Sequence, residues 1–242
     1  MCISKGATVL IFTPIKNTKV YEQVIEQIEN MIIDGTLKKG DRLPSERELV
    51  GHLKVSRTSI REALRALQVM GLIESRQGEG NFIRENFENT LFEPLSVMFM
   101  LQGGKPDEIM EVRKIIEVQT ANLAAEKINE KQLENLKRIA DTFKTSKNEE
   151  NNVKLDKKFH YEIAQAAGNF LIINILNAMS FLMDAFLKDA RRKILVNKEN
   201  FKALAEQHGR IYGALKLHDS KMASDEMKKH LDFTSKHIKK NM

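Results

Sequence analysis

The stretch "GDRLPSERELVGHLKVSRTSIREALRALQVMGLIESRQGEGNFI", residues 40–83, decides the fold of the N-terminal part of the chain. Ser45 is followed three positions later by Glu48, the spacing of a capping box, which predicts that a short helix begins here. Ser56 can cap a second helix, and Gly71 follows its end. The apolar residues of this second helix share one face: Ile60, Ala63, Leu64, Leu67 and Met70.

Two extended pieces follow the second helix, at residues 72–75 and 81–84. Between them, Gly78 and Gly80 permit the positive φ angles of a tight hairpin. A further helix is predicted upstream, where apolar residues recur at helical spacing: Val20, Val24, Ile28, Met31 and Ile32. The order helix, helix, turn, helix and β-hairpin predicts a winged helix-turn-helix within residues 14–85.

The sequence changes character after residue 85. Residues 86–106 are predicted to form a linker and a connecting helix, because they combine polar residues and Pro94 with one apolar run and a Gly-Gly-Lys-Pro stop. Every later segment has helical spacing, including one long helix expected over 170–195, so residues 107–242 are predicted to form an all-helical bundle. The fold class is therefore mainly α, a winged helix-turn-helix followed by a bundle.

The composition fits this organisation. The chain has 242 residues, of which 42% are hydrophobic and 30% charged, enough for two domains with buried cores. Because no stretch reaches the roughly 18 to 20 uncharged apolar residues of a membrane span, we expect no membrane partner and a cytoplasmic location. Cys2 is the single cysteine, which agrees with a reducing compartment and excludes a thiolate-based zinc site.

Arginines gather at the start of the predicted second helix of the motif. Arg57 and Arg61 are four residues apart, opposite the apolar stripe, so both can point outward to DNA. In a helix-turn-helix this region enters the major groove, where an arginine fork donating two hydrogen bonds to guanine gives roughly 1–3 kcal/mol of discrimination. Ser56 and Thr58 are short donors suited to phosphates. An ordinary charged helix face is the alternative, but the capped helix before it and the hairpin after it favour DNA binding.

This segment resembles the N-terminal domain of GntR-family transcription regulators. The family pattern Leu-Pro-Ser-Glu-Arg-Glu-Leu matches residues 43–49, and Val-Ser-Arg-x-x-Ile/Val-Arg-Glu-Ala-Leu matches residues 55–64. The resemblance implies that arginines contact bases or adjacent phosphates, that hydroxyl side chains contact the DNA backbone, and that the wing tip enters the minor groove. The residues it assigns to DNA are Arg47, Ser56, Arg57, Thr58, Arg61, Gln77 and Gly78.

Four polar residues occupy positions of the predicted bundle where the spacing requires apolar residues. Asp156 and His160 share one helix face, and His208 and His230 take inward positions on two later helices. The first two alone could be a local ion pair or a catalytic dyad, and a lone inward histidine is more often a hydrogen-bonded core residue. Together, three inward histidines and one inward aspartate predict a metal site of the kind that suits Zn²⁺, Ni²⁺ or Mn²⁺.

Three further stretches, "LDKKFHYEIAQAAGN", "EQHGRIYGAL" and "MKKHL", are similar to the FCD effector-binding domain of the FadR-type GntR subfamily. The resemblance implies that Asp156, His160, His208 and His230 bind a divalent metal ion, zinc in the first place, whose coordination is completed by a small carboxylate such as a hydroxy acid, a sugar acid or citrate. Arg113 matches an arginine common at the start of that domain, and its fork fits a carboxylate. It is the candidate effector anchor, with a salt bridge to Glu117 as the alternative.

The sequence therefore predicts a DNA-binding transcription regulator, not an enzyme. We expect a homodimeric repressor that binds an inverted-repeat operator and whose operator affinity depends on a small carboxylate held at the metal. In one alternative the metal itself is the signal. In another, disfavoured because no His-Glu-x-x-His motif supplies a general base, the helical domain is a metal-dependent hydrolase.

Overall fold

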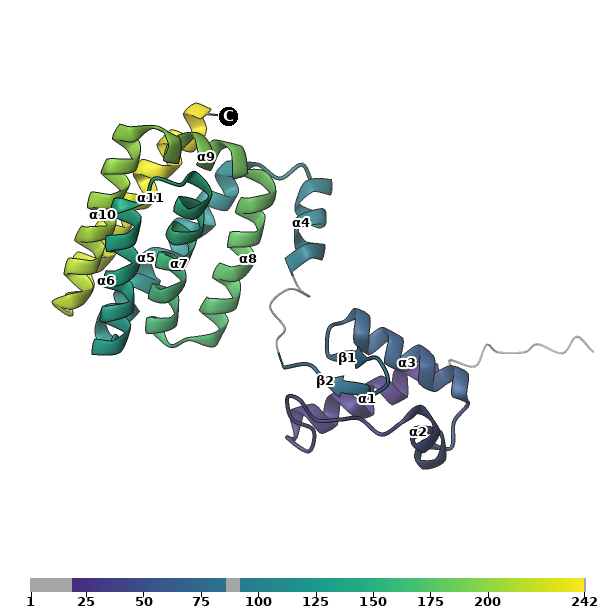
Figure 1. Cartoon of the computed structure of the whole chain (residues 1–242). Helices are drawn as coiled ribbons and strands as arrows, with labels where there is room; N and C mark the ends of the chain where they lie inside the picture. The colour runs from purple at the N-terminus through teal and green to yellow at the C-terminus, as the bar shows by residue number, and fades with distance from the viewer. Residues whose placement is uncertain (1–18, 86–91, 242) are drawn as a thin grey trace, which may run out of the picture. The chain divides into compact units, whose positions relative to one another are not determined.

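The structure is a computed structural model that describes residues 19–85 and 92–241. The chain divides into two compact units, residues 1–87 and 88–242 (Figure 1). Cys2 and the first part of the predicted linker, residues 86–91, lie outside the described residues.

The first unit is a winged helix-turn-helix, as predicted. It consists of α1 (Val20–Ile33), α2 (Glu46–Leu53), α3 (Arg57–Val69) and a hairpin of β1 (Ile73–Arg76) and β2 (Gly80–Ile83). The strands pair antiparallel, with Ile73 opposite Ile83. The three helices and the hairpin enclose one apolar core, whose buried members are Val24, Ile28, Leu43, Leu49, Ile60, Ala63, Leu64, Leu67, Ile73 and Ile83.

The local signals that predict this unit are all present. Ser45 Oγ accepts a hydrogen bond from Glu48 N at 3.3 Å, and Ser45 N donates to Glu48 Oε2 at 2.7 Å, which completes the capping box at the start of α2. Ser56 Oγ accepts from Ser59 N at 3.1 Å and caps α3. At the hairpin turn Gly78 has φ +77°, a backbone conformation that residues other than glycine rarely adopt.

One strand contact in the first unit was not predicted. Arg42 forms an isolated antiparallel bridge to Phe82 of β2, and Leu43 N donates to Asn81 O at 2.8 Å. The segment before α2 is therefore attached along the wing.

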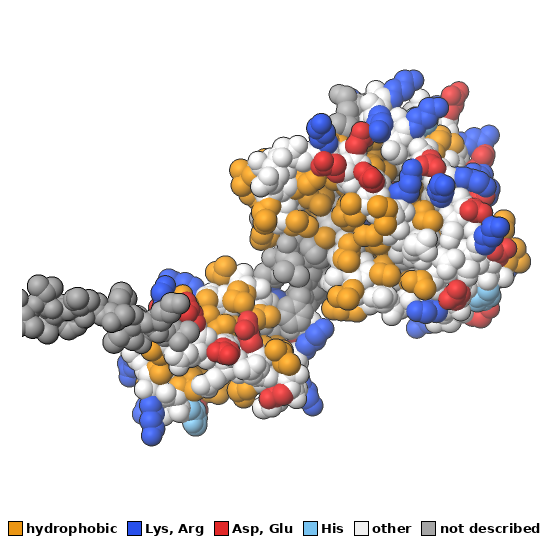
Figure 2. Space-filling view, turned by 180° about the vertical axis from the view of Figure 1, so that it is seen from behind, with side chains coloured by type: hydrophobic (Ala, Val, Ile, Leu, Met, Phe, Trp, Pro, Cys, Tyr) orange, Lys and Arg blue, Asp and Glu red, His pale blue; other side chains and the backbone are white. Residues whose placement is uncertain are grey.

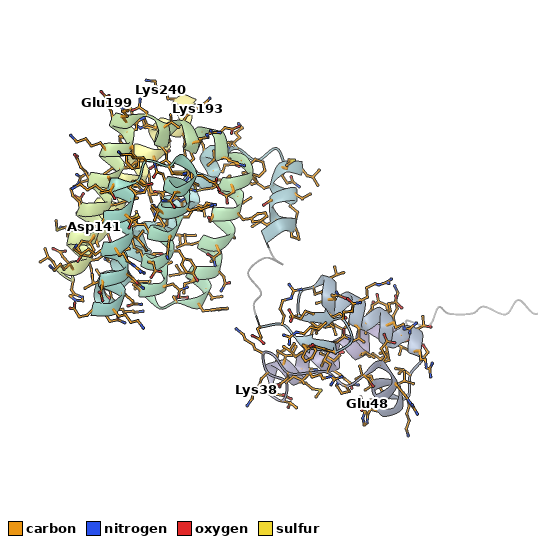
Figure 3. The ribbon with its side chains drawn as sticks, in the orientation of Figure 1. Lys38, Glu48, Asp141, Lys193, Glu199 and Lys240 are labelled. Atoms are coloured by element: carbon orange, nitrogen blue, oxygen red, sulfur yellow. The ribbon has the colours of Figure 1, made fainter. Side chains whose placement is uncertain are left out.

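The second unit is an all-helical bundle. Its helices are α4 (Phe92–Leu101), α5 (Pro106–Lys127), α6 (Glu130–Thr145), α7 (Glu149–Ala167), α8 (Phe170–Phe186), α9 (Lys188–Val196), α10 (Lys198–Lys216) and α11 (Ser220–Asn241). α5 packs along α7 and α11, and α10 packs against α11 and α6. Charged side chains such as Asp141, Lys193 and Glu199 point away from the interior of the bundle (Figure 3).

The expectation of one continuous helix over residues 170–195 is wrong. The chain bends by 84° between α8 and α9, around Leu187, which is fully buried. No proline or glycine marks the bend, so its cause is tertiary packing: Leu187, Ala190 and Ile194 join the apolar cluster formed with Met179 and Met183 of α8. The bend turns one face of α9 into the bundle.

No single helix among the described residues is long and apolar enough to cross a bilayer. The bent pair α8 and α9 together could do so by length and composition only. The buried face of this pair belongs to the apolar cluster just described.

Candidate functional site

The four predicted metal ligands converge in the interior of the helical unit. Asp156 and His160 lie one turn apart on α7, His208 lies on α10 and His230 on α11. Each offers a ligand atom, and these atoms all lie within 4.8 Å of one another. The spacing that placed each residue on an apolar face also brings all four side chains to one point, because those faces line the same core.

The ligand atoms are close enough to share one ion. His208 Nε2 lies 3.2 Å from Asp156 Oδ1, His160 Nε2 lies 3.2 Å from His230 Nε2, and His160 Nε2 lies 3.9 Å from Asp156 Oδ1. His208 and His230 are 0% and 2% exposed, and Asp156 is buried too. A small cation can therefore contact all four residues away from bulk water.

An acceptor oxygen lies on the outer side of two imidazoles, which favours metal binding on the inner side. His230 Nδ1 donates to Gln207 Oε1 at 2.9 Å, and His160 Nδ1 lies 2.5 Å from Glu117 Oε2. An imidazole whose Nδ1 carries the proton presents the Nε2 lone pair. With both rings in this tautomer, two lone pairs face each other across the 3.2 Å between His160 Nε2 and His230 Nε2. Such an arrangement is repulsive unless a cation or an extra proton lies between them. The residues present therefore fit a metal ion.

The surroundings of His208 also favour a bound metal ion. Its ring stacks on Phe159, with ring centroids 4.2 Å apart, and both of its ring nitrogens are buried without a hydrogen-bond partner among the described residues. Buried polar atoms are normally hydrogen-bonded, so an orphaned nitrogen facing Asp156 indicates a ligand. Burial lowers the pKa of His208, and burial together with the nearby His208 and His160 lowers the pKa of His230 well below its usual range. Lowered pKa values favour the neutral imidazole that binds metals.

Arg191 of α9, which was not predicted to belong to the site, pairs with Asp156. Arg191 Nη2 donates to Asp156 Oδ2, and both side chains are buried. Burial opposes ionisation of Asp156, but the Arg191 charge and the neighbouring histidines outweigh it and hold the pKa of Asp156 well below its ordinary value. No sequence pattern indicates this contact, because a straight helix was expected here and the bend that turns Arg191 inward was not.

Arg113 of α5 forms the salt bridge that was its alternative assignment. Its Nε donates to Glu117 Oε1, and its Nη1 donates to Met183 Sδ at 2.9 Å. Burial would raise the pKa of Glu117, but Arg113 and His160 hold it well below its ordinary value. Glu117 therefore lies between Arg113 and His160, one of the candidate metal ligands. Glu117 and Gln207, which orient His160 and His230, were not predicted as site residues.

A cavity of about 370 Å³ opens beside the cluster. Most of the residues that line it are polar or cationic, and they are Arg113, Glu117, Lys154, Lys157, Lys158, His160, Tyr161, Leu176, Asn177, Ser180, Met183 and Arg191. Asn177 contributes an amide nitrogen that is buried without a hydrogen-bond partner among the described residues. The cavity thus brings donors and positive charge next to His160.

In the winged unit, the residues assigned to DNA are exposed. Arg47 lies on α2, Arg57, Thr58 and Arg61 lie in the first turns of α3, and Gln77 and Gly78 form the wing tip, while Ser56 caps α3. Arg61 is partly engaged, because its Nε donates to Glu46 Oε2 of α2 at 2.8 Å. Both side chains of this pair remain largely accessible, so Arg61 can exchange the carboxylate for another acceptor.

Comparison with known proteins places both units in one family. Residues 20–83 match the bacterial regulatory proteins of the gntR family, and residues 108–233 match the FCD domain. The chain is 37% identical over 206 residues to the HTH-type transcriptional regulator LutR of Bacillus subtilis (strain 168), which covers 83% of this chain and 93% of that protein. It is 31% identical over 204 residues to the Glc operon transcriptional activator of Escherichia coli (strain K12), covering 81% and 80%.

A solved structure agrees on the fold. Streptococcus agalactiae GntR superposes with a TM-score of 0.68 at 24% identity, covering 89% of this chain and 99% of that one. The chain belongs to the GntR family and carries an FCD domain after its DNA-binding domain. It is a DNA-binding transcription regulator rather than an enzyme, and its FCD domain contains a candidate metal site of one aspartate and three histidines.

Proposed function

We propose that a small carboxylate, bound at a metal ion in the FCD domain, controls the affinity of this regulator for its operator. The observation that carries the proposal is the convergence of four ligand atoms within 4.8 Å beside a cavity lined by cations. Asp156, His160, His208 and His230 would hold the ion. When bound, the ion supplies a Lewis acid with open positions for the oxygens of the effector.

Zinc is the proposed ion, with nickel or manganese as alternatives. Imidazole nitrogen suits Zn²⁺ and Ni²⁺, and the carboxylate extends the range towards Mn²⁺. His230 donates one outer hydrogen bond to Gln207, and His160 contacts Glu117 on its outer side. Outer partners of this type fix the tautomer of a metal-bound histidine. The chemistry of the donors therefore supports a borderline divalent metal.

The charge of the cavity supports an acid as the effector. Arg113, Lys154, Lys157, Lys158 and Arg191 line it, and Glu117 is the acidic residue among its lining residues. Arginine forks suit carboxylates, and the orphaned amide nitrogen of Asn177 is a donor for a hydroxyl or carboxylate oxygen. A hydroxy acid, a sugar acid or citrate has both groups. We propose Arg113 as an anchor that keeps its bond to Glu117 while its remaining donors face the acid.

A homodimer is the proposed assembly, bound to an inverted-repeat operator in the cytoplasm. Two-fold symmetry in the protein requires two-fold symmetry in the DNA that it reads. Support comes from exposed apolar side chains on α4, α5 and α8, three helices linked by packing of α8 against the other two. Figure 2 shows many apolar side chains gathered on the visible face of the helical unit. The exposed residues are Leu95, Val97, Met98, Met100, Leu101, Val112, Ile115, Phe170, Leu171, Ile175 and Phe181.

Repression is the proposed mode of action. The Glc operon protein is named as an activator, so the family alone does not fix the sign of regulation. A reporter gene behind the chain's own promoter region measures that sign: expression should rise when the regulator is deleted, and a fall on deletion would mean activation.

Fluorescence anisotropy with a labelled duplex from the chain's own promoter region tests the proposal. Zinc-loaded full-length protein is titrated into the duplex alone and with lactate, gluconate or citrate at millimolar concentration. We expect one of these acids to change the dissociation constant several-fold, in the range of typical allosteric couplings of about 5- to 150-fold. His208→Leu is the matched variant that should respond to none of them.

Two results would redirect the proposal. Equal operator affinity with and without a wide panel of acids, in the zinc-loaded protein, would contradict control by a carboxylate. If chelation alone removes or restores operator binding at a fixed acid concentration, the metal itself is the signal.

A further inference from the structure

The carboxylate of Asp156 is divided between two partners. Its Oδ1 faces the histidines, 3.2 Å from His208 Nε2, while its Oδ2 accepts a hydrogen bond from Arg191 Nη2. Arginine and carboxylate often pair through two parallel hydrogen bonds that use both oxygens. Here the contact runs to Oδ2, and the other oxygen is turned towards the candidate metal position.

Arg191 is fixed where this contact requires it. It lies in the first turn of α9, directly after the 84° bend at the buried Leu187, and it is itself only 6% exposed. Its neighbours on the same face, Ile194 and Leu195, are buried as well. The helix is thus anchored by apolar packing on the side that directs Arg191 to Asp156, so the guanidinium has little freedom to follow a moving carboxylate.

We propose that Arg191 is a positioning residue for the metal. By holding Oδ2, it limits Asp156 to binding the ion through Oδ1 alone and keeps that oxygen turned towards the histidines. A carboxylate that binds through both oxygens would take one more coordination position. Arg191 therefore raises the affinity for the metal and preserves an open position for the effector. This inference rests on the proposed metal site and adds a residue from a helix that supplies no ligand.

Arg191→Gln in the full-length protein tests the assignment. Glutamine can donate a hydrogen bond, but it lacks the positive charge and the paired N–H donors of the guanidinium. Zinc affinity is measured by competition with a chromophoric chelator, and we expect a loss of about 10- to 100-fold, the usual effect of removing an outer-sphere partner. Arg192→Gln is the matched control, because Arg192 is the next residue of α9 and is exposed; its zinc affinity should stay within two-fold of wild type.

The visible absorption of the Co²⁺ form provides a readout that a purely structural ion pair would not change. Once Oδ2 is released, Asp156 can bind through both oxygens, so the coordination number rises and the d–d absorption of Arg191→Gln weakens and shifts relative to wild type. Arg191→Lys keeps the charge without the fork and should recover part of the zinc affinity. If Arg191→Gln does not fold, Arg191→Met, which keeps an unbranched side chain but has no donor for Oδ2, carries the same test through its Co²⁺ spectrum.

The outcomes separate this inference from the proposed function. Zinc affinity and a Co²⁺ spectrum identical to wild type in the folded variants would show that Arg191 serves only as a structural partner of Asp156. A wild-type protein that binds neither zinc nor cobalt would instead overturn the metal site itself, and this inference with it.

Discussion

Arg57 and His208 both belong to regular helices, yet the first is exposed to solvent and the second is 0% exposed. Arg57 takes its position from local structure, since Ser56 caps the helix that carries it. His208 takes its proposed role from three other helices, because α7 and α11 supply the remaining candidate ligands and Arg191 of α9 contacts one of them. Changes in the DNA-reading surface should therefore act locally, whereas changes at the metal site should affect the whole bundle.

The largest effect is expected at His208. Replacing it by Leu removes a ligand and keeps an apolar side chain against Phe159, so metal affinity should fall by more than the roughly 100-fold that outer-sphere partners reach. Competition with a chelator measures the change. His52→Leu, an exposed histidine on α2, is the control and should leave metal binding unchanged. Zinc affinity equal to wild type in His208→Leu would remove His208 from the site.

Metal removal should destabilise one unit only. Zinc at about 1,000 times its dissociation constant adds roughly 4 kcal/mol to the free energy of unfolding of a protein that binds it in the folded state alone. Scanning calorimetry with and without a chelator should show a lower midpoint for the helical unit and an unchanged one for the winged unit. A shift of both transitions would mean that the two units do not respond separately.

Arg57→Ala should change base preference and leave the fold and the metal site intact. Loss of a guanine contact is expected to reduce discrimination by roughly 1–3 kcal/mol, whereas loss of a phosphate contact would weaken binding to all sequences alike. Anisotropy titrations with the promoter duplex and with single-base variants distinguish the two. A uniform loss across all duplexes would show that Arg57 contacts the DNA backbone.

Ser45→Ala should have the smallest effect. It removes the side-chain half of the capping box at α2, and such substitutions reduce stability by about 1 kcal/mol. Hydrogen exchange should show faster opening of α2 and unchanged protection in the helical unit. Reduced protection around His208 would contradict the local character of the first unit.

The sequence predicted what depends on local signals. The Ser45 and Glu48 capping box, the Ser56 cap and the glycines of the wing each act within a few residues, so the winged unit could be predicted element by element. The four candidate ligands were also predictable, because a histidine or an aspartate in an apolar stripe can be recognised from the spacing alone, without knowledge of its contacts. Their meeting point followed from the packing of amphipathic helices onto one core.

The remaining parts of the site depend on tertiary packing. The bend at Leu187 carries no proline or glycine, so the sequence indicated a straight helix and left Arg191 unassigned. Gln207 directly precedes His208 in the chain but contacts His230 on α11, which no local spacing indicates. The spacing of four residues indicates Glu117 as a partner of Arg113, whereas its contact with His160 depends on how α5 packs on α7. Each of these contacts joins two helices whose relative placement no short sequence pattern specifies.

Anomalous diffraction at the zinc absorption edge, from crystals of the zinc-loaded full-length protein, tests the central claim most directly. The predicted result is one strong peak per chain, bound by Asp156, His160, His208 and His230, with nitrogen ligands at about 2.0–2.1 Å. The absence of a peak between these side chains, with His160 and His230 still in direct contact, would contradict the account.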